Sequence, residues 1–268
     1  MDQGARELLE LARDVARRAA DTARRMRTDA IGRVDTKSTA TDVVTAADKA
    51  VEQQIVAELR GVRPDDAFLG EEYGTQDEAA GSGVRWIIDP IDGTVNYLYG
   101  LPQYAISIAA EVDGEVVAGV VRNAVTDAEW TATLGGGAWR DGRRLTGSSQ
   151  QVLSQALVGT GFAYSAQRRA HQGAVLAGLI TRVRDIRRFG SAALDLAAAA
   201  EGMLDAYYEK GLAPWDLAAG GLVAREAGLL VTGLSGRPAG PDLVLAAPPG
   251  LHKLLHDQLV ELDADGGP

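Results

Sequence analysis

The amino-acid sequence predicts an α+β first half joined to an α/β second half. Three observations support this fold class: a long helical pattern at the N-terminus, a run of strands joined by Asp-Gly turns, and strands that alternate with helices towards the C-terminus. The character of the chain changes at a polar Gly/Ser/Gln stretch close to residue 148. We therefore expect two domains, residues 1–147 and residues 148–268.

Two helices are expected to open the first half. Residues 5–27 place leucine, alanine and valine side chains at helical spacing, which predicts one long amphipathic helix. The second helix is expected to begin near Thr45, because Thr45-Ala46-Ala47-Asp48 has the spacing of a capping box. Apolar residues such as Ile55 and Leu59 then recur on one face of this helix.

The rest of the first half is expected to form strands, most of them in an antiparallel sheet. The dipeptide Asp113-Gly114 between two alternating segments is a strong hairpin signal, and Asp141-Gly142 predicts a further turn. Strands are expected over 67–69, 84–88, 104–112, 115–122 and 129–134.

The second half is expected to alternate between strands and helices. Strands are expected over 156–161, 185–189 and 204–209 and near Leu229 and Leu243. Helices are expected over 166–182, 191–201, 215–227 and 249–262. This alternation is typical of an α/β unit.

Composition excludes several classes of site and partner. The 268 residues include no cysteine, which excludes disulfides, thiolate zinc sites and cysteine nucleophiles. The formal net charge of −10 opposes general nucleic-acid binding, which requires a basic face. The sequence has neither an apolar run that could span a membrane nor the apolar core of a signal peptide. A cytoplasmic enzyme is therefore expected.

The segment Asp89-Pro90-Ile91-Asp92-Gly93-Thr94 carries the clearest chemical signal. It follows Val84–Ile88, a predicted buried strand, so two carboxylates leave the strand end together before a turn that suits a helix start. Carboxylate oxygens suit Mg²⁺, and backbone N–H groups at a helix start attract phosphate. Phosphoryl chemistry is one interpretation. An ordinary surface turn is the other, because Asp, Pro and Gly are common turn residues.

Other carboxylates weaken the surface-turn interpretation. Glu71 follows another predicted strand, whereas Asp48 and Asp216 lie at predicted helix starts. Each of them alone also fits a solvated loop or a favourable charge at a helix N-terminus. His252 and His256 have the spacing of a zinc pair but lack the glutamate of a metalloprotease motif, which favours a solvated helix face.

On these residues the chain resembles the inositol monophosphatase family, in the lithium-sensitive, Mg²⁺-dependent phosphatase superfamily. Residues 86–97, Trp-Ile-Ile-Asp-Pro-Ile-Asp-Gly-Thr-Val-Asn-Tyr, look like its first signature, and residues 215–220, Trp-Asp-Leu-Ala-Ala-Gly, look like its second. The segments 37–48, 70–72, 190–192 and 207–209 follow in the family's order. The resemblance, which covers roughly residues 5 to 260, implies a layered αβαβα fold and a homodimer.

The resemblance also implies a set of metal ligands. Glu71, Asp89 and the backbone carbonyl of Ile91 would hold a first Mg²⁺, and Asp89, Asp92 and Asp216 would hold a second. Whether a third ion is used stays open. Two such cations would clamp the phosphate, and Li⁺ is expected to displace the more loosely held one.

Catalytic and substrate-binding residues follow from the same resemblance. Glu71 and the pair Thr94–Asp48 would orient and deprotonate the attacking water. The phosphate would accept hydrogen bonds from the N–H groups of Gly93 and Thr94, while Glu209 would bind inositol hydroxyls. The implied substrate-binding residues are Ile91, Asp92, Gly93, Thr94, Gly190, Ser191, Ala192, Glu209 and Asp216.

The resemblance implies a phosphatase that hydrolyses myo-inositol monophosphate. Histidinol phosphate, fructose 1,6-bisphosphate and adenosine 3′,5′-bisphosphate are the alternative substrates, although no basic pocket for a second phosphate is recognisable in the sequence. A regulatory binding protein of the transcription or translation machinery is the alternative from another class.

Overall fold

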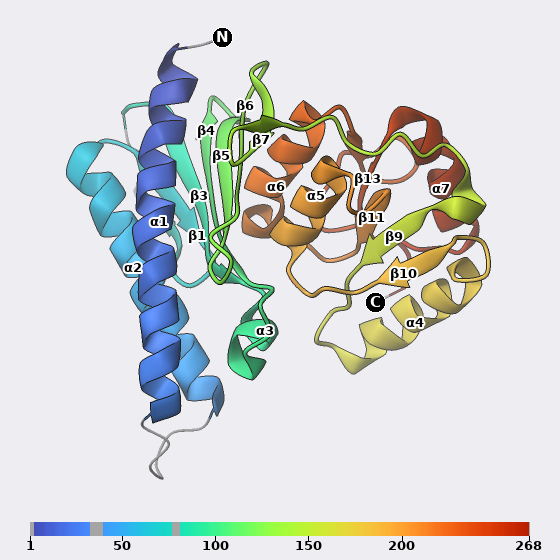
Figure 1. Ribbon diagram of the computed structural model, residues 1–268, viewed down its shortest axis with the longest axis horizontal. Helices are drawn as coiled ribbons and strands as arrows, with labels where there is room; N and C mark the ends of the chain where they lie inside the picture. The colour runs from blue at the N-terminus through green and yellow to red at the C-terminus, as the bar shows by residue number, and fades with distance from the viewer. Residues whose placement is uncertain (1–2, 33–39, 77–80, 268) are drawn as a thin grey trace.

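Two β-sheets separate three layers of helices in the computed structural model of the chain, which describes residues 3–32, 40–76 and 81–267 (Figure 1). Across the molecule the order is helix, sheet, helix, sheet, helix. The layered αβαβα fold implied by the resemblance is thereby confirmed.

The first layer consists of α1 (Gln3–Gly32) and α2 (Ala40–Val62), which cover one face of the first sheet. The long first helix is confirmed, but α2 begins before Thr45. The predicted start was wrong because residues 40–44 contain neither glycine nor proline, so the helix continues past the capping-box spacing. Residues 37 and 38, part of the resemblance, lie outside the described residues.

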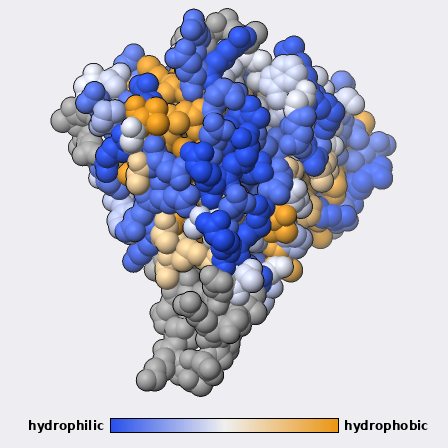
Figure 2. Space-filling model, turned by 60° about the vertical axis from the view of Figure 1, so that its left-hand side comes forward, coloured by the Kyte–Doolittle hydropathy of each residue, from blue (hydrophilic) through white to orange (hydrophobic). Residues whose placement is uncertain are grey.

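The outward face of α1 and α2 is mostly hydrophilic, with smaller hydrophobic areas (Figure 2). Exposed charged residues of α1 such as Asp14, Arg17 and Arg18 face away from the sheet, as expected of an amphipathic helix. No helix within the described ranges is both long enough and apolar enough to cross a lipid bilayer.

The first sheet has the strand order β2-β1-β3-β4-β5-β6-β7-β8. β1 runs parallel to β3, and the other neighbouring strands are antiparallel. The predicted hairpin is confirmed, with φ of 51° at Asp113 and 84° at Gly114. The strands are β1 (Ala67–Gly70), β2 (Gly74–Gln76), β3 (Val84–Asp92), β4 (Ala105–Val112), β5 (Glu115–Asn123), β6 (Glu129–Thr133), β7 (Gly137–Arg140) and β8 (Arg143–Arg144).

β3 continues through the predicted turn at its end. It was expected to stop at Ile88, but it extends to Asp92, and its pairing with β4 shifts register between Asp89 and Asp92. The irregular pairing accommodates Pro90, which has no N–H for the hydrogen-bond ladder. The short helix α3 (Thr94–Tyr99) then follows, as the sequence predicts.

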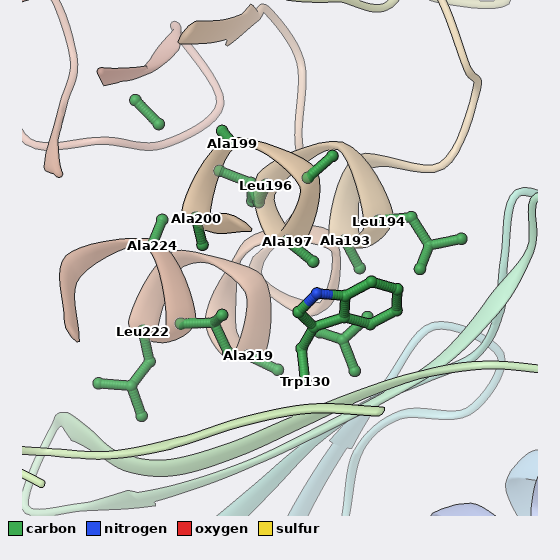
Figure 3. Packing of buried hydrophobic residues seen from close by; sticks show 14 of the residues in the cluster. Trp130, Ala193, Leu194, Leu196, Ala197, Ala199, Ala200, Ala219, Leu222 and Ala224 are labelled. Carbon is green, nitrogen blue, oxygen red and sulfur yellow. The ribbon is translucent and has the colours of Figure 1, made fainter. Parts of the chain in front are cut away.

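The middle layer consists of α5 (Ala192–Glu201) and α6 (Pro214–Glu226), which pack against each other between the two sheets. Figure 3 shows alanine and leucine side chains filling the space between these helices and Trp130 of the first sheet. A Cβ on Gly220 would lie only 3.0 Å from Cβ of Leu196. Small side chains therefore let the two helices approach closely, which fixes the start of α6 relative to α5.

The second sheet has the order β10-β9-β11-β13-β12 and is mixed: β10, β9 and β11 are parallel, and β13 and β12 continue antiparallel. α4 and α7 lie on its outer side (Figure 1). The elements are β9 (Leu157–Thr160), α4 (Ala166–Leu179), β10 (Asp185–Arg187), β11 (Ala206–Glu209), β12 (Leu230–Thr232), β13 (Val244–Ala247) and α7 (Pro249–Glu261), with a short 3-10 helix, η1 (Leu153–Gln155), before them. The division into domains 1–147 and 148–268 stays a prediction, because the middle layer packs against both sheets.

Candidate functional site

A cavity of about 470 Å³ opens where the first sheet, the middle layer and the second sheet meet. The first sheet contributes the turn after β1, the end of β3 and the start of α3. The second half contributes the loop before α4, the segments on either side of the start of α5, the end of β11 and the start of α6. The lining residues include Glu71, Asp89, Ile91, Asp92, Gly93, Thr94, Gly190, Ala192, Glu209 and Asp216.

Three carboxylates form a cluster in this cavity, which we call the carboxylate cluster: Asp89, Asp92 and Asp216. One oxygen from each lies within 4.8 Å of the others. Asp89 is 1% exposed and Asp92 7% exposed. In a regular strand, residues three apart point to opposite faces, so the irregular pairing of β3 is what lets Asp89 and Asp92 meet.

Asp92 is held by the N-terminus of α5. Its Oδ2 accepts hydrogen bonds from the hydroxyl of Ser191 at 2.5 Å and from the N–H of Ala193 at 2.8 Å. The N–H of Ala192 donates to Oδ1 at 3.3 Å. Ser191, which was expected to bind substrate, is buried, and its hydroxyl donates its hydrogen bond to Asp92.

Asp216 lies in the first turn of α6, as the sequence predicts. Its Oδ2 accepts a hydrogen bond from the N–H of Ala213 at 2.7 Å, so the side chain closes the helix N-terminus, and Asp216 also lines the cavity. Pro214 at the helix start needs no N–H partner there, which suits this tight entry. The helix start thus aims the carboxylate at Asp89 and Asp92.

Glu71 lies in the turn after β1, beside β3, where its N–H donates to the carbonyl of Ile88 at 3.3 Å. Glu71 is exposed and lines the cavity, but it is not one of the three residues whose oxygens lie within 4.8 Å of one another. Partial burial and the charge of Asp216 raise the pKa of Glu71 to about 7.

The carboxylates repel one another in this site. Burial and then the charge of Asp216 raise the pKa of Asp92 to about 7. Burial, followed by the charges of Glu71 and Asp92, raises the pKa of Asp89 as well. Oxygen donors with unbalanced negative charge suit a hard cation such as Mg²⁺, so the residues fit the metal implied by the resemblance.

Asp48 lies on α2 behind this group and is 3% exposed. Its Oδ1 has no hydrogen-bond partner within the described parts of the chain. Burial and the nearby charges of Glu71 and Glu72 raise its pKa to about 8. No hydrogen bond joins Asp48 to Thr94 among the described residues, so their pairing stays a prediction.

Gly93 makes the sharp exit from β3 into α3. Its φ of 94° is in the left-handed region, and a Cβ there would lie 2.9 Å from the carbonyl oxygen of Gln103. Only glycine fits this position. The turn therefore places Gly93 and Thr94 in the lining of the cavity, next to the carboxylate cluster.

Glu209, at the end of β11, lines the side of the cavity that the second sheet contributes. Its Oε2 accepts a hydrogen bond from the hydroxyl of Tyr207 at 2.5 Å. Burial raises the pKa of Glu209 to about 7, although the Tyr207 hydroxyl and the charge of Arg188 oppose this rise. A carboxylate in this place can accept hydrogen bonds from two hydroxyls of a ligand.

Sequence reasoning missed the cationic side of the cavity. Arg168, Arg188 and Lys210 all line it, yet no basic pocket was recognised in the sequence. Arginine recurs throughout 168–188 in helix, strand and loop alike, so the sequence alone does not show which arginines meet in one cavity. Lys210 already donates to the carbonyl oxygens of Asp265 and Gly266.

The two histidines of α7 have structural partners. Nε2 of His252 lies 2.9 Å from the hydroxyl oxygen of Thr232, and Nε2 of His256 accepts from the N–H of Ser235 at 3.1 Å. The hydrogen bonds tie α7 to the strand and turn beside it, and His252 is buried rather than on a solvated face. Within the described residues the carboxylate cluster is the group of metal-type ligands that the geometry brings together.

The sequence also matches a known protein family and proteins of that family. A sequence profile of the inositol monophosphatase family matches residues 5–264. An inositol-1-monophosphatase of Mycobacterium leprae is 48% identical over 229 residues, which cover 82% of this chain and 79% of that protein. A Nus factor SuhB of Pseudomonas aeruginosa is 41% identical over 231 residues, covering 83% of this chain and 85% of that protein.

The fold is also similar to that of solved structures. The structure of Mycobacterium tuberculosis SuhB matches with a TM-score of 0.84 at 39% sequence identity, covering 99% of this chain and 100% of that chain. The similarity thus includes the whole layered arrangement, with the elements that carry the carboxylates.

Proposed function

This chain belongs to the inositol monophosphatase family, and we propose that it is a Mg²⁺-dependent phosphatase for myo-inositol monophosphate. That it is a phosphoric monoester hydrolase follows from the family and from the names of its relatives. The observation that carries the finer proposal is the carboxylate cluster, because it stands in one cavity with Glu209.

The carboxylates are the proposed metal ligands. Glu71, Asp89 and the backbone carbonyl of Ile91 would hold one Mg²⁺, and Asp89, Asp92 and Asp216 would hold a second. The proposal does not specify whether a third ion binds. When bound, the ions would neutralise the phosphate charge and make the attacking water more acidic.

The chain's own residues would then orient the reactants. Glu71 and Asp48 are the proposed groups that accept the proton of the attacking water, supported by their place beside the cluster, where the charges of both act on Asp89. The Thr94 hydroxyl would help to orient the water. N–H groups of Gly93 and Thr94 would donate to the phosphate oxygens.

The alcohol part of the substrate would lie towards the second sheet. There Glu209 would accept two ring hydroxyls, and the turn Gly190-Ser191-Ala192 would contact the ring through its backbone, since the Ser191 hydroxyl is used by Asp92. Hydroxyls of a ligand can donate to the acceptor positions of Glu209 that Tyr207 leaves open, which supports a polyol ester as substrate.

A regulatory role is the second candidate function. It is supported by the relative from Pseudomonas aeruginosa that is named a Nus factor. Such a role is compatible with the catalytic one, because it would use the outer surface. A homodimer in the cytoplasm is the proposed form of the protein; exposed apolar side chains beside the site, such as Val95, Tyr99 and Leu101, are consistent with a protein contact there.

The proposed function is tested by phosphate release in Mg²⁺ across a panel: D- and L-inositol 1-phosphate, histidinol phosphate, fructose 1,6-bisphosphate and adenosine 3′,5′-bisphosphate. We expect preference for the inositol phosphates, lost in Asp92→Asn and kept in Asp127→Asn, which changes an exposed carboxylate away from the cavity. Preference for a bisphosphate would instead assign Arg168 and Arg188 to the second phosphate. No release from any ester would refute the catalytic proposal.

A further inference from the structure

Glu52 is a buried carboxylate that the proposed chemistry does not use. It lies on α2, one turn after Asp48, is 0% exposed, and is absent from the residues that line the cavity. Burying a carboxylate is unfavourable unless strong partners compensate, and burial accordingly raises the pKa of Glu52. A carboxylate buried at this position therefore requires partners that compensate for its burial.

The partners of Glu52 are backbone groups of the turn that carries Glu71. Its Oε2 accepts from the N–H of Glu72 at 2.9 Å, and its Oε1 accepts from the N–H of Tyr73 at 3.2 Å. The turn joins β1 to β2, whose last ladder pair is Gly70–Gly74, so these two N–H groups lie where the strands no longer pair. One carboxylate satisfies both donors.

Gly70 makes this contact possible. A Cβ at this position would lie 2.0 Å from Oε1 and 2.3 Å from Cδ of Glu52. The requirement for glycine is one of space, since the carboxylate lies directly against the backbone of residue 70. Glu52 thus contacts the turn on both sides of Glu71: at Gly70 before it and at Glu72 and Tyr73 after it.

We propose that Glu52 is a positioning residue that locks the β1–β2 turn so that Glu71 faces the carboxylate cluster, and that it thereby raises the affinity of the site for Mg²⁺. The N–H of Glu71 is fixed to Ile88 on one side, and Glu52 fixes the next two residues on the other. The effect on Mg²⁺ rests on the proposed function, because it takes Glu71 as a metal ligand. Residues that orient metal ligands commonly contribute about 10- to 100-fold in affinity.

Two variants test this role by different routes. Glu52→Gln keeps the side-chain shape but replaces one acceptor oxygen with an NH₂ group, which cannot accept from a backbone N–H. Gly70→Ala leaves Glu52 unchanged and displaces its carboxylate sterically. We expect each to weaken Mg²⁺ binding about 10-fold in calorimetric titration and to speed hydrogen exchange at the Glu72 and Tyr73 amides of the metal-free protein.

The double variant and a matched control complete the experiment. If both substitutions break the same contact, Glu52→Gln with Gly70→Ala should bind Mg²⁺ no more weakly than the worse single variant. Glu129→Gln is the control, because it neutralises another buried carboxylate, paired with Arg13 and Arg122 outside the cavity. It should lose stability and keep Mg²⁺ affinity.

The possible failures are distinguishable. Unchanged Mg²⁺ affinity and unchanged amide exchange in both single variants, beside a wild type that binds Mg²⁺ and releases phosphate, would overturn the role of Glu52 alone. Lower stability with unchanged affinity would show a merely structural residue and would also overturn it. A wild-type chain that binds no Mg²⁺ would overturn the proposed function itself.

Discussion

The hydroxyl of Ser191 donates a 2.5 Å hydrogen bond to Oδ2 of Asp92, and so connects α5 to the end of β3. The same hydroxyl oxygen accepts from the N–H of Leu194 at 3.3 Å, which makes Ser191 the N-cap of α5. One side chain therefore both begins the helix and holds a proposed metal ligand.

Ser191→Ala should lower stability and activity together. Losing the N-cap and the bond to Asp92 should cost about 1–2 kcal/mol of unfolding free energy. Asp92 keeps its two backbone donors, so we expect a roughly 10-fold loss of kcat/KM rather than abolition. Urea unfolding and phosphate release measure the two effects. Ser148→Ala, which removes a serine–aspartate hydrogen bond to Asp205 away from the cavity, should lose stability alone.

Asp216→Asn should change activity and metal-free stability in opposite directions. The charge of Asp216 raises the pKa of both Glu71 and Asp92, so its removal relieves repulsion. The asparagine oxygen can still accept from Ala213. We expect phosphate release to fall at least about 100-fold, whereas urea unfolding without Mg²⁺ should show a more stable protein. A less stable variant would contradict the electrostatic account.

The stability of the metal-free protein should fall as the pH rises. Unfolded carboxyl groups titrate near pH 4, but Asp92 and Asp48 in the folded chain have pKa values of about 7 and about 8. Between these values the folded state holds more protons than the unfolded state, so stability decreases with pH and levels off above about pH 8. Thermal unfolding in EDTA measures this slope, and Asp48→Asn should reduce it.

Mg²⁺ should oppose the fall in stability with rising pH. Binding requires deprotonated carboxylates, so the rise in melting temperature on adding Mg²⁺ should be larger at pH 8 than at pH 5.5. Equal Mg²⁺ stabilisation at both pH values would count against ligands with raised pKa.

Li⁺ should inhibit phosphate release at fixed Mg²⁺ by displacing the ion proposed at the carboxylate cluster.

Glu209→Gln should separate binding of the alcohol from the chemistry at phosphorus. An amide accepts hydroxyls at only one of its two positions, so KM for inositol 1-phosphate should rise about 10-fold. Hydrolysis of an ester without vicinal hydroxyls, such as p-nitrophenyl phosphate, should change little. Equal losses on both esters would place the role of Glu209 in the chemistry itself.

The elements and most of the carboxylates were predictable because each stands at a local signal. Asp216 follows Ala213-Pro214 at a helix start, and Glu71 follows an apolar run, so position along the chain is enough to find them. The hairpin at Asp113-Gly114 was predictable for the same reason. The family resemblance then supplied the layers, which local patterns do not determine.

What escaped prediction depends on contacts between distant segments. The extension of β3 to Asp92 requires pairing with β4, which no local pattern reveals. Glu52 looks like any acidic residue of an amphipathic helix until the turn after β1 lies against it. Arg188 is one of several arginines, and only the packing of the second sheet brings it to the cavity.

The middle layer also imposes an order of events on synthesis. Asp89 and Asp92 leave the ribosome early. The helix α5, which holds Asp92, and the helix α6, which carries Asp216, are made only after most of the chain. A nascent chain that ends before α6 carries two of the three clustered carboxylates and leaves one face of its first sheet uncovered. Acquisition of the proposed metal would therefore mark a chain that has been translated through both halves.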